Sequence, residues 1–337
     1  MRSRMSMLNA SLVAAALAAT APGPATAQPV AATPLQLETK IPLGQVKGRI
    51  DHLAVDLAHH RLFVAELGND TVAVVDLDSR KLLRVIAGLK EPQGVGYVPS
   101  TETLYVANAR DGTVQLFRGE HDTPGDAVRL GADADNVRFD AATGKLVVGH
   151  GGGALAIIDP ASVSKPADIP LPGHPEAFQL THDGQRIYVN IPSAQAIVVI
   201  DRAARRETAR WPTHGMSANF AMALGEAAGE VIVAFRHPAK LAAFAMANGS
   251  IGASADSCGD IDDVFVDAKR RRIYASCGEG FLDVLDKAST PWRRLARVPT
   301  VAGARTSLFV PELDRLFVAV RADGQEPAAI WVFRPVP

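Results

Sequence analysis

The feature that most constrains the fold is a short apolar motif that recurs seven times along the 337 residues. Its second residue falls at positions 62, 104, 146, 187, 231, 273 and 316, so successive copies lie 42, 42, 41, 44, 42 and 43 residues apart. Each copy is rich in β-branched and aromatic residues, whereas a helical repeat would show a 3.6-residue period. A repeat of this length and character predicts the blades of a β-propeller.

Each repeat divides into four predicted strands, with the motif as the second. The seventh repeat reaches Pro337 before a fourth strand can form, but residues 36–43 resemble the fourth strands of the other repeats. We therefore expect an all-β, seven-bladed propeller of four-stranded blades, closed by the N-terminal strand pairing into the last blade. This pairing would remove the open edges between the last and first blades. It should bury Leu37, Ile41 and Leu43.

Residues 1–27 have the layout of a secretory signal peptide. Arg2 and Arg4 precede an apolar run over residues 8–19, and small residues end at Ala27. The run is shorter than the roughly 20 residues that span a bilayer. We expect cleavage near Ala27, a flexible linker over 28–34, a single propeller domain over 35–337, and a periplasmic or secreted protein without membrane insertion.

The charge balance gives no support for a nucleic-acid partner. The chain has 35 Lys and Arg against 36 Asp and Glu, and loss of Arg2 and Arg4 would leave 33 against 36, a net charge of −3. The basic run at 269–272 falls in a turn between two strands and is interpreted as a solvated turn. We expect a monomer.

The two cysteines, Cys258 and Cys277, both lie in the part expected to be exported. In an oxidising compartment such a pair predicts a disulfide rather than a zinc site, which needs four ligands. Strand pairing would place Cys277 opposite Asp262, so the bridge would hold the loop that precedes this residue.

The motif copies that end at Asn108 and Asn190 read Leu-Tyr-Val-Ala-Asn and Ile-Tyr-Val-Asn. In these copies the chain resembles the YVTN-repeat, YncE-like family of exported bacterial β-propellers, and the resemblance extends over residues 35–335. It implies the propeller fold and export, but no particular reaction.

Counting from the motif predicts the residues at one mouth of the central channel. Residues that enter each inner strand should meet those that leave each second strand, which brings Asp51 near Glu66, Gln93 near Asn108 and Asp135 near His150. In full, the expected ligand-binding residues are Asp51, His52, Glu66, Gln93, Asn108, Asp135, Asn136, His150, Glu176, Asn219, Asp262 and Arg305.

Two functions fit such a face. The first is a binding module for a small molecule, a peptide or an envelope protein, because the sequence has no complete catalytic signature. The alternative is a metal-dependent hydrolase, lactonase or lyase on the same acidic, histidine-containing face. We expect no cofactor for the binding module, whereas the alternative would use a divalent cation with Asp51, Asp135, His150, Glu176 and Asp262 as its candidate ligands. Simple solvation of the channel mouth would also explain these polar residues.

Overall fold

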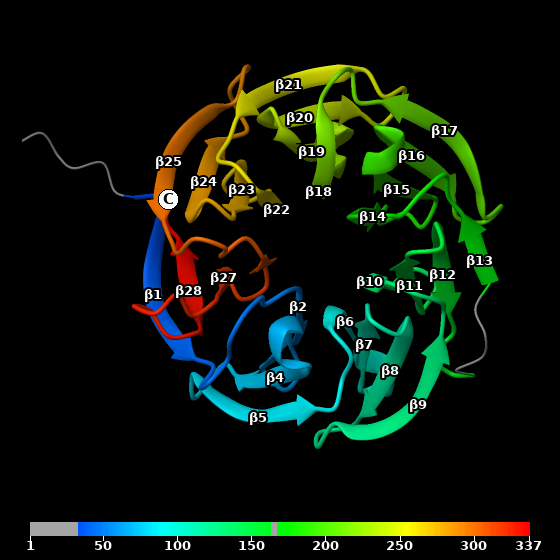
Figure 1. Ribbon diagram of the computed structural model, residues 1–337. Helices are drawn as coiled ribbons and strands as arrows, with labels where there is room; N and C mark the ends of the chain where they lie inside the picture. Colours follow the sequence, from blue (N-terminus) through cyan, green and yellow to red (C-terminus); the bar gives the residue numbers. More distant parts are fainter. Residues whose placement is uncertain (1–32, 163–166) are drawn as a thin grey trace, which may run out of the picture. The chain divides into compact units, whose positions relative to one another are not determined.

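The computed structural model describes residues 33–162 and 167–337, and within them the strands form seven four-stranded antiparallel sheets arranged in a ring (Figure 1). The first three blades are β2 (Leu53–Asp56), β3 (Arg61–Glu66), β4 (Thr71–Asp76) and β5 (Lys81–Ala87); β6 (Pro92–Val98), β7 (Thr103–Asn108), β8 (Thr113–Arg118) and β9 (Thr123–Arg129); and β10 (Ala134–Asp140), β11 (Lys145–His150), β12 (Ala154–Ile158) and β13 (Ala167–Pro170). The next three are β14 (Phe178–Leu180), β15 (Arg186–Ile191), β16 (Ala196–Asp201) and β17 (Arg206–Pro212); β18 (Ser217–Gly225), β19 (Glu230–His237), β20 (Ala239–Ala245) and β21 (Ile251–Asp256); and β22 (Ile261–Asp267), β23 (Arg272–Cys277), β24 (Phe281–Asp286) and β25 (Arg293–Pro299).

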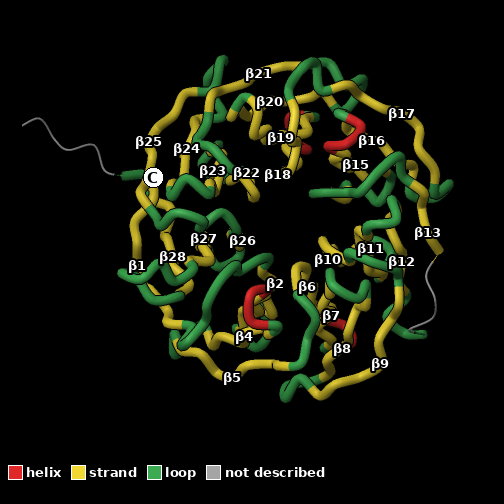
Figure 2. Tube along the Cα trace, viewed as in Figure 1, coloured by secondary structure: helices red, strands yellow, loops and turns green. Residues whose placement is uncertain are grey.

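The seventh blade contains β26 (Ser307–Val310), β27 (Arg315–Val320) and β28 (Ala329–Pro335), and its fourth strand is β1 (Leu35–Pro42) from the other end of the chain. The predicted closure is therefore confirmed. Short 3-10 turns at Leu67–Asn69, Pro99–Thr101, Pro192–Ala194 and Glu226–Ala228 are the described helical elements (Figure 2). No described helix has the length and apolar character required to cross a membrane. The predicted signal peptide lies outside the described residues.

The apolar core lies between neighbouring blades. Side chains of each sheet alternate between its two faces, so each blade packs against the blade before it and the blade after it. Tyr105, Tyr188 and Tyr274, which follow the first residue of their motif copies by two positions, are fully buried in these layers. The motif thus recurs once per blade because each blade contributes one such strand to the apolar layers.

The closing strand β1 contacts both of its neighbouring layers because its register shifts between Leu37 and Thr39. Leu35 is buried with Tyr274 of the sixth blade, whereas Ile41 and Leu43 are buried with Leu62 of the first blade. The expectation that Leu37 is also buried was wrong, because its side chain is 41% exposed. A bulge reverses the facing of all residues beyond it, and the alternation in the sequence does not reveal it.

Candidate functional site

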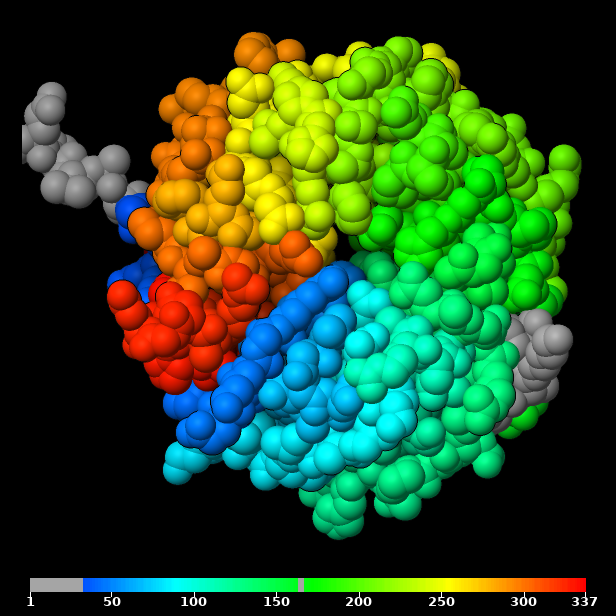
Figure 3. Space-filling model, viewed as in Figure 1, coloured from blue at the N-terminus to red at the C-terminus, as the bar shows by residue number. Residues whose placement is uncertain are grey.

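One face of the ring carries the loops that run from the outer strand of each blade to the inner strand of the next (Figure 2). A narrow hollow opens at the centre of this face (Figure 3). Six predicted residues stand beside the starts of the inner strands around this channel mouth: Asp51, His52, Asp135, Glu176, Asp262 and Arg305. The backbone of His52 donates a hydrogen bond to the carbonyl of Gln93, which links the first two blades at the mouth.

Two of the three predicted pairs are displaced by one residue, because the inner strands β6 and β10 carry bulges, and Asn108 pairs with Pro92 instead of Gln93. His150 pairs with Ala134 instead of Asp135, and the register shifts between Ala134 and Val137. In the same way Cys277 pairs with Ile261 instead of Asp262. A one-residue displacement changes the face to which a side chain points. The residues at the ends of the second strands therefore do not join the ring at the mouth.

Five of the expected ligand-binding residues instead form hydrogen bonds or polar contacts within or between blades. Glu66 accepts a hydrogen bond from Thr71, at 2.6 Å. Asn108 accepts from the backbone of Lys90. Other contacts of this kind join His150 to Asp168, Asn219 to Asn190, and Gln93 to Asp133. Asn136 is buried, and its side-chain oxygen accepts no hydrogen bond within the described structure.

On one side of the mouth the charges neutralise one another. Arg236 binds Asp260 at 3.2 Å and Asp262 at 2.7 Å. Arg305 binds the same two carboxylates, at 2.9 and 2.8 Å. Two guanidinium groups and two carboxylates thus form a closed cluster with no net charge, which we call the neutral cluster. Arg236 also lies over the ring of Phe220, 3.9 Å from its centroid.

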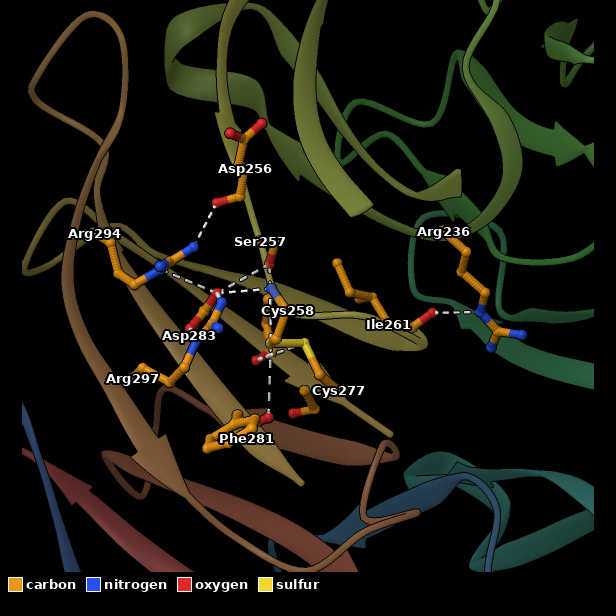
Figure 4. Close-up of a disulfide and its surroundings, with 12 residues drawn as sticks. Arg236, Asp256, Ser257, Cys258, Ile261, Cys277, Phe281, Asp283, Arg294 and Arg297 are labelled. Carbon is orange, nitrogen blue, oxygen red and sulfur yellow. Dashed lines mark hydrogen bonds and ion pairs between the residues drawn. A yellow bond between two sulfur atoms is a disulfide. The ribbon is translucent and has the colours of Figure 1, made fainter. Parts of the chain in front are cut away.

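The predicted disulfide between Cys258 and Cys277 is present, with the Cα atoms 5.8 Å apart. It joins the loop after β21 to the end of β23, a few residues from Asp260 (Figure 4). The backbone of Cys258 donates to Asp283, which Arg297 also binds. The bridge and this buried carboxylate fix the loop that supplies the neutral cluster.

On the other side of the mouth, Asp135, His174 and Glu176 lie together, and no arginine or lysine of the described residues forms an ion pair with them. Each offers one potential metal-ligand atom, and the three atoms lie within 4.8 Å of one another. Asp135 is 7% exposed and its Oδ1 accepts no hydrogen bond within the described structure. His52 Nε2 is 3.9 Å from this oxygen, beyond hydrogen-bond length. We call these three residues the Asp-His-Glu cluster.

Burial shifts the pKa values of three groups at the mouth. Burial raises the pKa of Asp51 to about 6, although Arg49 and Arg305 oppose this shift. Burial, and then the charge of Asp262, raises the pKa of Glu176 to about 7. Burial also lowers the pKa of His52 to about 4. Such shifts are typical of sites that act on charged ligands, and also of buried structural networks.

A cavity of about 370 Å³ continues from the mouth into the channel. Its ionisable lining residues are His52, Arg138, Glu226 and Asp263, and Val264 and Leu308 are among its apolar residues. Asp263 accepts a hydrogen bond from the backbone of Ser307, at 2.8 Å. The cavity falls within the size of small-molecule sites.

Counting from the motif missed Asp133 and Asp260, although a signal for them exists. Both lie two residues before a ring position, as do Arg49 and His174. Asp133 and Asp260 each occupy a left-handed turn, with φ of 55°. The turn places the side chains of Asp133 and Asp260 beside Asp135 and Asp262 at the mouth. Counting 13 residues back from each motif anchor, in addition to 11, would therefore have found them.

Fold and site together define a seven-bladed β-propeller with a charged channel mouth. Solved structures share the fold: hydrazine synthase of Kuenenia stuttgartiensis (TM-score 0.72, 17% identity, 81% of this chain and 94% of that chain) and a chain of a mitotic checkpoint complex (TM-score 0.74, 14% identity, 96% and 99%). No protein-family model matches the sequence, and no curated protein matches it significantly. At these identities the similarity concerns the fold alone.

Proposed function

We propose that the protein is an exported, YncE-like propeller that binds a small positively charged ligand at its channel mouth. The observation that carries the proposal is the asymmetry of the mouth. The arginines Arg236 and Arg305 are fully engaged by Asp260 and Asp262. Among the described residues no arginine or lysine forms an ion pair with the Asp-His-Glu cluster, and a bound cation would offset the cost of burying its carboxylates in charged form.

Two features support export. Residues 1–27 have the sequence pattern of a signal peptide. The disulfide between Cys258 and Cys277 belongs to a class of bond that persists in oxidising compartments. Fractionation of cells that express the full chain, with mass determination of the mature protein, tests this part of the proposal. A protein that keeps residues 1–27 in the cytoplasm would contradict it.

Ligand binding is tested with organic ammonium ions, because these carry the charge that the mouth lacks. The probes are putrescine, spermidine and lysine, titrated by calorimetry in the presence of EDTA. We expect at least one to bind with a Kd below about 1 mM. Glu176→Gln should weaken that binding about tenfold, since the lost charge lies at the mouth.

The matched control is Glu279→Gln, which removes an exposed carboxylate from the same face of the sixth blade. Binding that both variants weaken equally would reflect the net charge alone and would contradict a site at the mouth. Absence of binding by all three probes would also count against an organic ligand. The geometry gives hydrolase or lyase chemistry at this face no separate support.

A further inference from the structure

We propose that the Asp-His-Glu cluster is a binding site for a divalent transition-metal ion of the Zn²⁺ type. The proposal rests on the proposed function, because it names the ligand of the same channel mouth. The ion would be held by Asp135 at the start of β10 and by His174 and Glu176 in the loop that leads into β14. Two neighbouring blades would thus contribute to one site.

The geometry of the three side chains is close to that of a formed site. Zn²⁺ lies about 2.0 to 2.2 Å from nitrogen and oxygen ligands, so ligand atoms arranged tetrahedrally around one ion are about 3.4 Å apart. The ligand atoms of the cluster lie within 4.8 Å of one another. Side-chain movements of no more than about 1 Å would therefore bring all three to one ion.

The surroundings leave the cluster in need of a cation. Oδ1 of Asp135 and Nδ1 of His174 are both buried, and neither has a hydrogen-bond partner among residues 33–162 and 167–337. Asp133 adds a further carboxylate 3.7 Å from that nitrogen. The nearby cation Arg49 is already paired with Asp51, at 2.7 Å. An ion would supply the missing partner for two of these buried atoms.

The ligand types indicate which ion to expect. One imidazole and two carboxylates form a mixed nitrogen and oxygen set, which suits Zn²⁺, Mn²⁺ or Co²⁺. Ca²⁺ prefers six to eight oxygen ligands and gains little from His174. Three protein ligands would also leave a coordination position for water or for a second ligand entering from the channel mouth.

The experiment is a titration of Zn²⁺ into the mature, EDTA-treated and dialysed protein, followed by calorimetry. We expect one ion per chain and weaker binding of Ca²⁺. Asp135→Asn, His174→Ala and Glu176→Gln should each weaken Zn²⁺ binding about tenfold or more, since even outer-shell groups are worth that much. The matched controls are His214→Ala and Glu279→Gln, which remove exposed side chains of the same kinds.

Co²⁺ provides a second readout that tests ligation directly. Its visible absorption spectrum should change on binding to the parent protein, and His174→Ala should alter the spectrum because an imidazole leaves the coordination shell. Asp135 is buried, so the fold of Asp135→Asn is checked by circular dichroism. His174 and Glu176 are partly exposed, and their variants test the site even if Asp135→Asn misfolds.

The outcomes separate this inference from the proposed function. Zn²⁺ binding that the three variants leave unchanged, or no Zn²⁺ binding at all, would overturn the metal site. Organic ammonium ions that bind in EDTA would preserve the proposed function in that case. Zn²⁺ binding lost in the three variants, with no organic ion bound, would establish the metal ion itself as the ligand of the mouth.

Discussion

The guanidinium group of Arg270 binds both carboxylate oxygens of Asp314, with N–O distances of 2.7 Å for each pair. Arg270 lies in the turn between β22 and β23 of the sixth blade, and Asp314 lies in the corresponding turn of the seventh. Nearby, Arg272 donates to the carbonyls of Pro34 and Val336. Two arginines of the basic run thus hold the blade that joins both ends of the ring, whereas Arg271 is exposed.

Replacing Arg270 should therefore destabilise the closed ring. We expect Arg270→Ala to lower the free energy of unfolding by about 2 kcal/mol, because it removes the guanidinium group that bridges Asp314 and Asp267. The control Arg271→Ala should change it by less than about 0.5 kcal/mol. Urea unfolding measures both variants. Equal effects of the two substitutions would mean that the ion pair does not support closure.

The closing strand offers a sharper comparison between two of its apolar residues. Ile41 is 1% exposed between the seventh and first blades, whereas Leu37 is 41% exposed. Ile41→Ala should cost about 2 to 4 kcal/mol of stability, and Leu37→Ala should cost less than about 1 kcal/mol. Thermal and urea unfolding give these values. A Leu37→Ala variant as unstable as Ile41→Ala would contradict the register shift in β1.

The contrast between Ile41 and Leu37 shows which features of the structure can be predicted from the sequence and which cannot. The 41- to 44-residue period identifies the blades, because each repeat must bury one apolar layer against the next. The same period locates Asp51, Asp135 and Asp262 at the channel mouth. It cannot place Asn108 or His150, because a bulge adds one residue to the inner strand opposite each of them without a regular signal in the sequence.

The ion pairs at the channel mouth could not be predicted from the sequence either. Asp262 is paired with arginines and Asp135 is not, because the neighbouring blades place arginine side chains next to Asp262 only. Arg236 is 26 residues from Asp262, and Arg305 is 43 residues from it, and both meet it only in the folded ring. The difference between the neutral cluster and the Asp-His-Glu cluster is therefore a property of the fold.

The stability of the protein should fall as pH rises through the pKa of Asp51. Burial raises this pKa from 3.8 to about 6, so the folded state holds a proton that the unfolded state has lost between these values. The shift of about 2.2 units corresponds to at most about 3 kcal/mol. Between pH 4 and pH 7, the parent should lose this much stability relative to Asp51→Asn. Urea unfolding of both proteins at each pH checks the difference.

Asp314 should give the opposite sign and serves as the control. Its bonds to Arg270 lower its pKa to about 2, so its contribution is present above pH 4 and is lost as pH falls toward 2. The stability difference between the parent and Asp314→Asn should therefore be constant from pH 5 to pH 7 and shrink below pH 4. If instead the parent gains stability relative to Asp51→Asn as the pH rises, the raised pKa of Asp51 is contradicted.

The disulfide should contribute both to global stability and to the order of the loop at the mouth. Cys258 and Cys277 are 19 residues apart, and closing a loop of this size stabilises a protein by roughly 3 kcal/mol. We expect the double variant Cys258→Ala and Cys277→Ala to lose about that much free energy of unfolding, measured with urea.

The same variant should also loosen the loop at the mouth. Hydrogen exchange should accelerate in residues 257–262, and Arg236 and Arg305 should bind Asp260 less firmly, because that loop carries their partner. A reductant should lower the unfolding midpoint of the parent and leave that of the double variant unchanged. If the double variant matches the oxidised parent in both unfolding and exchange, the bridge does not organise the mouth.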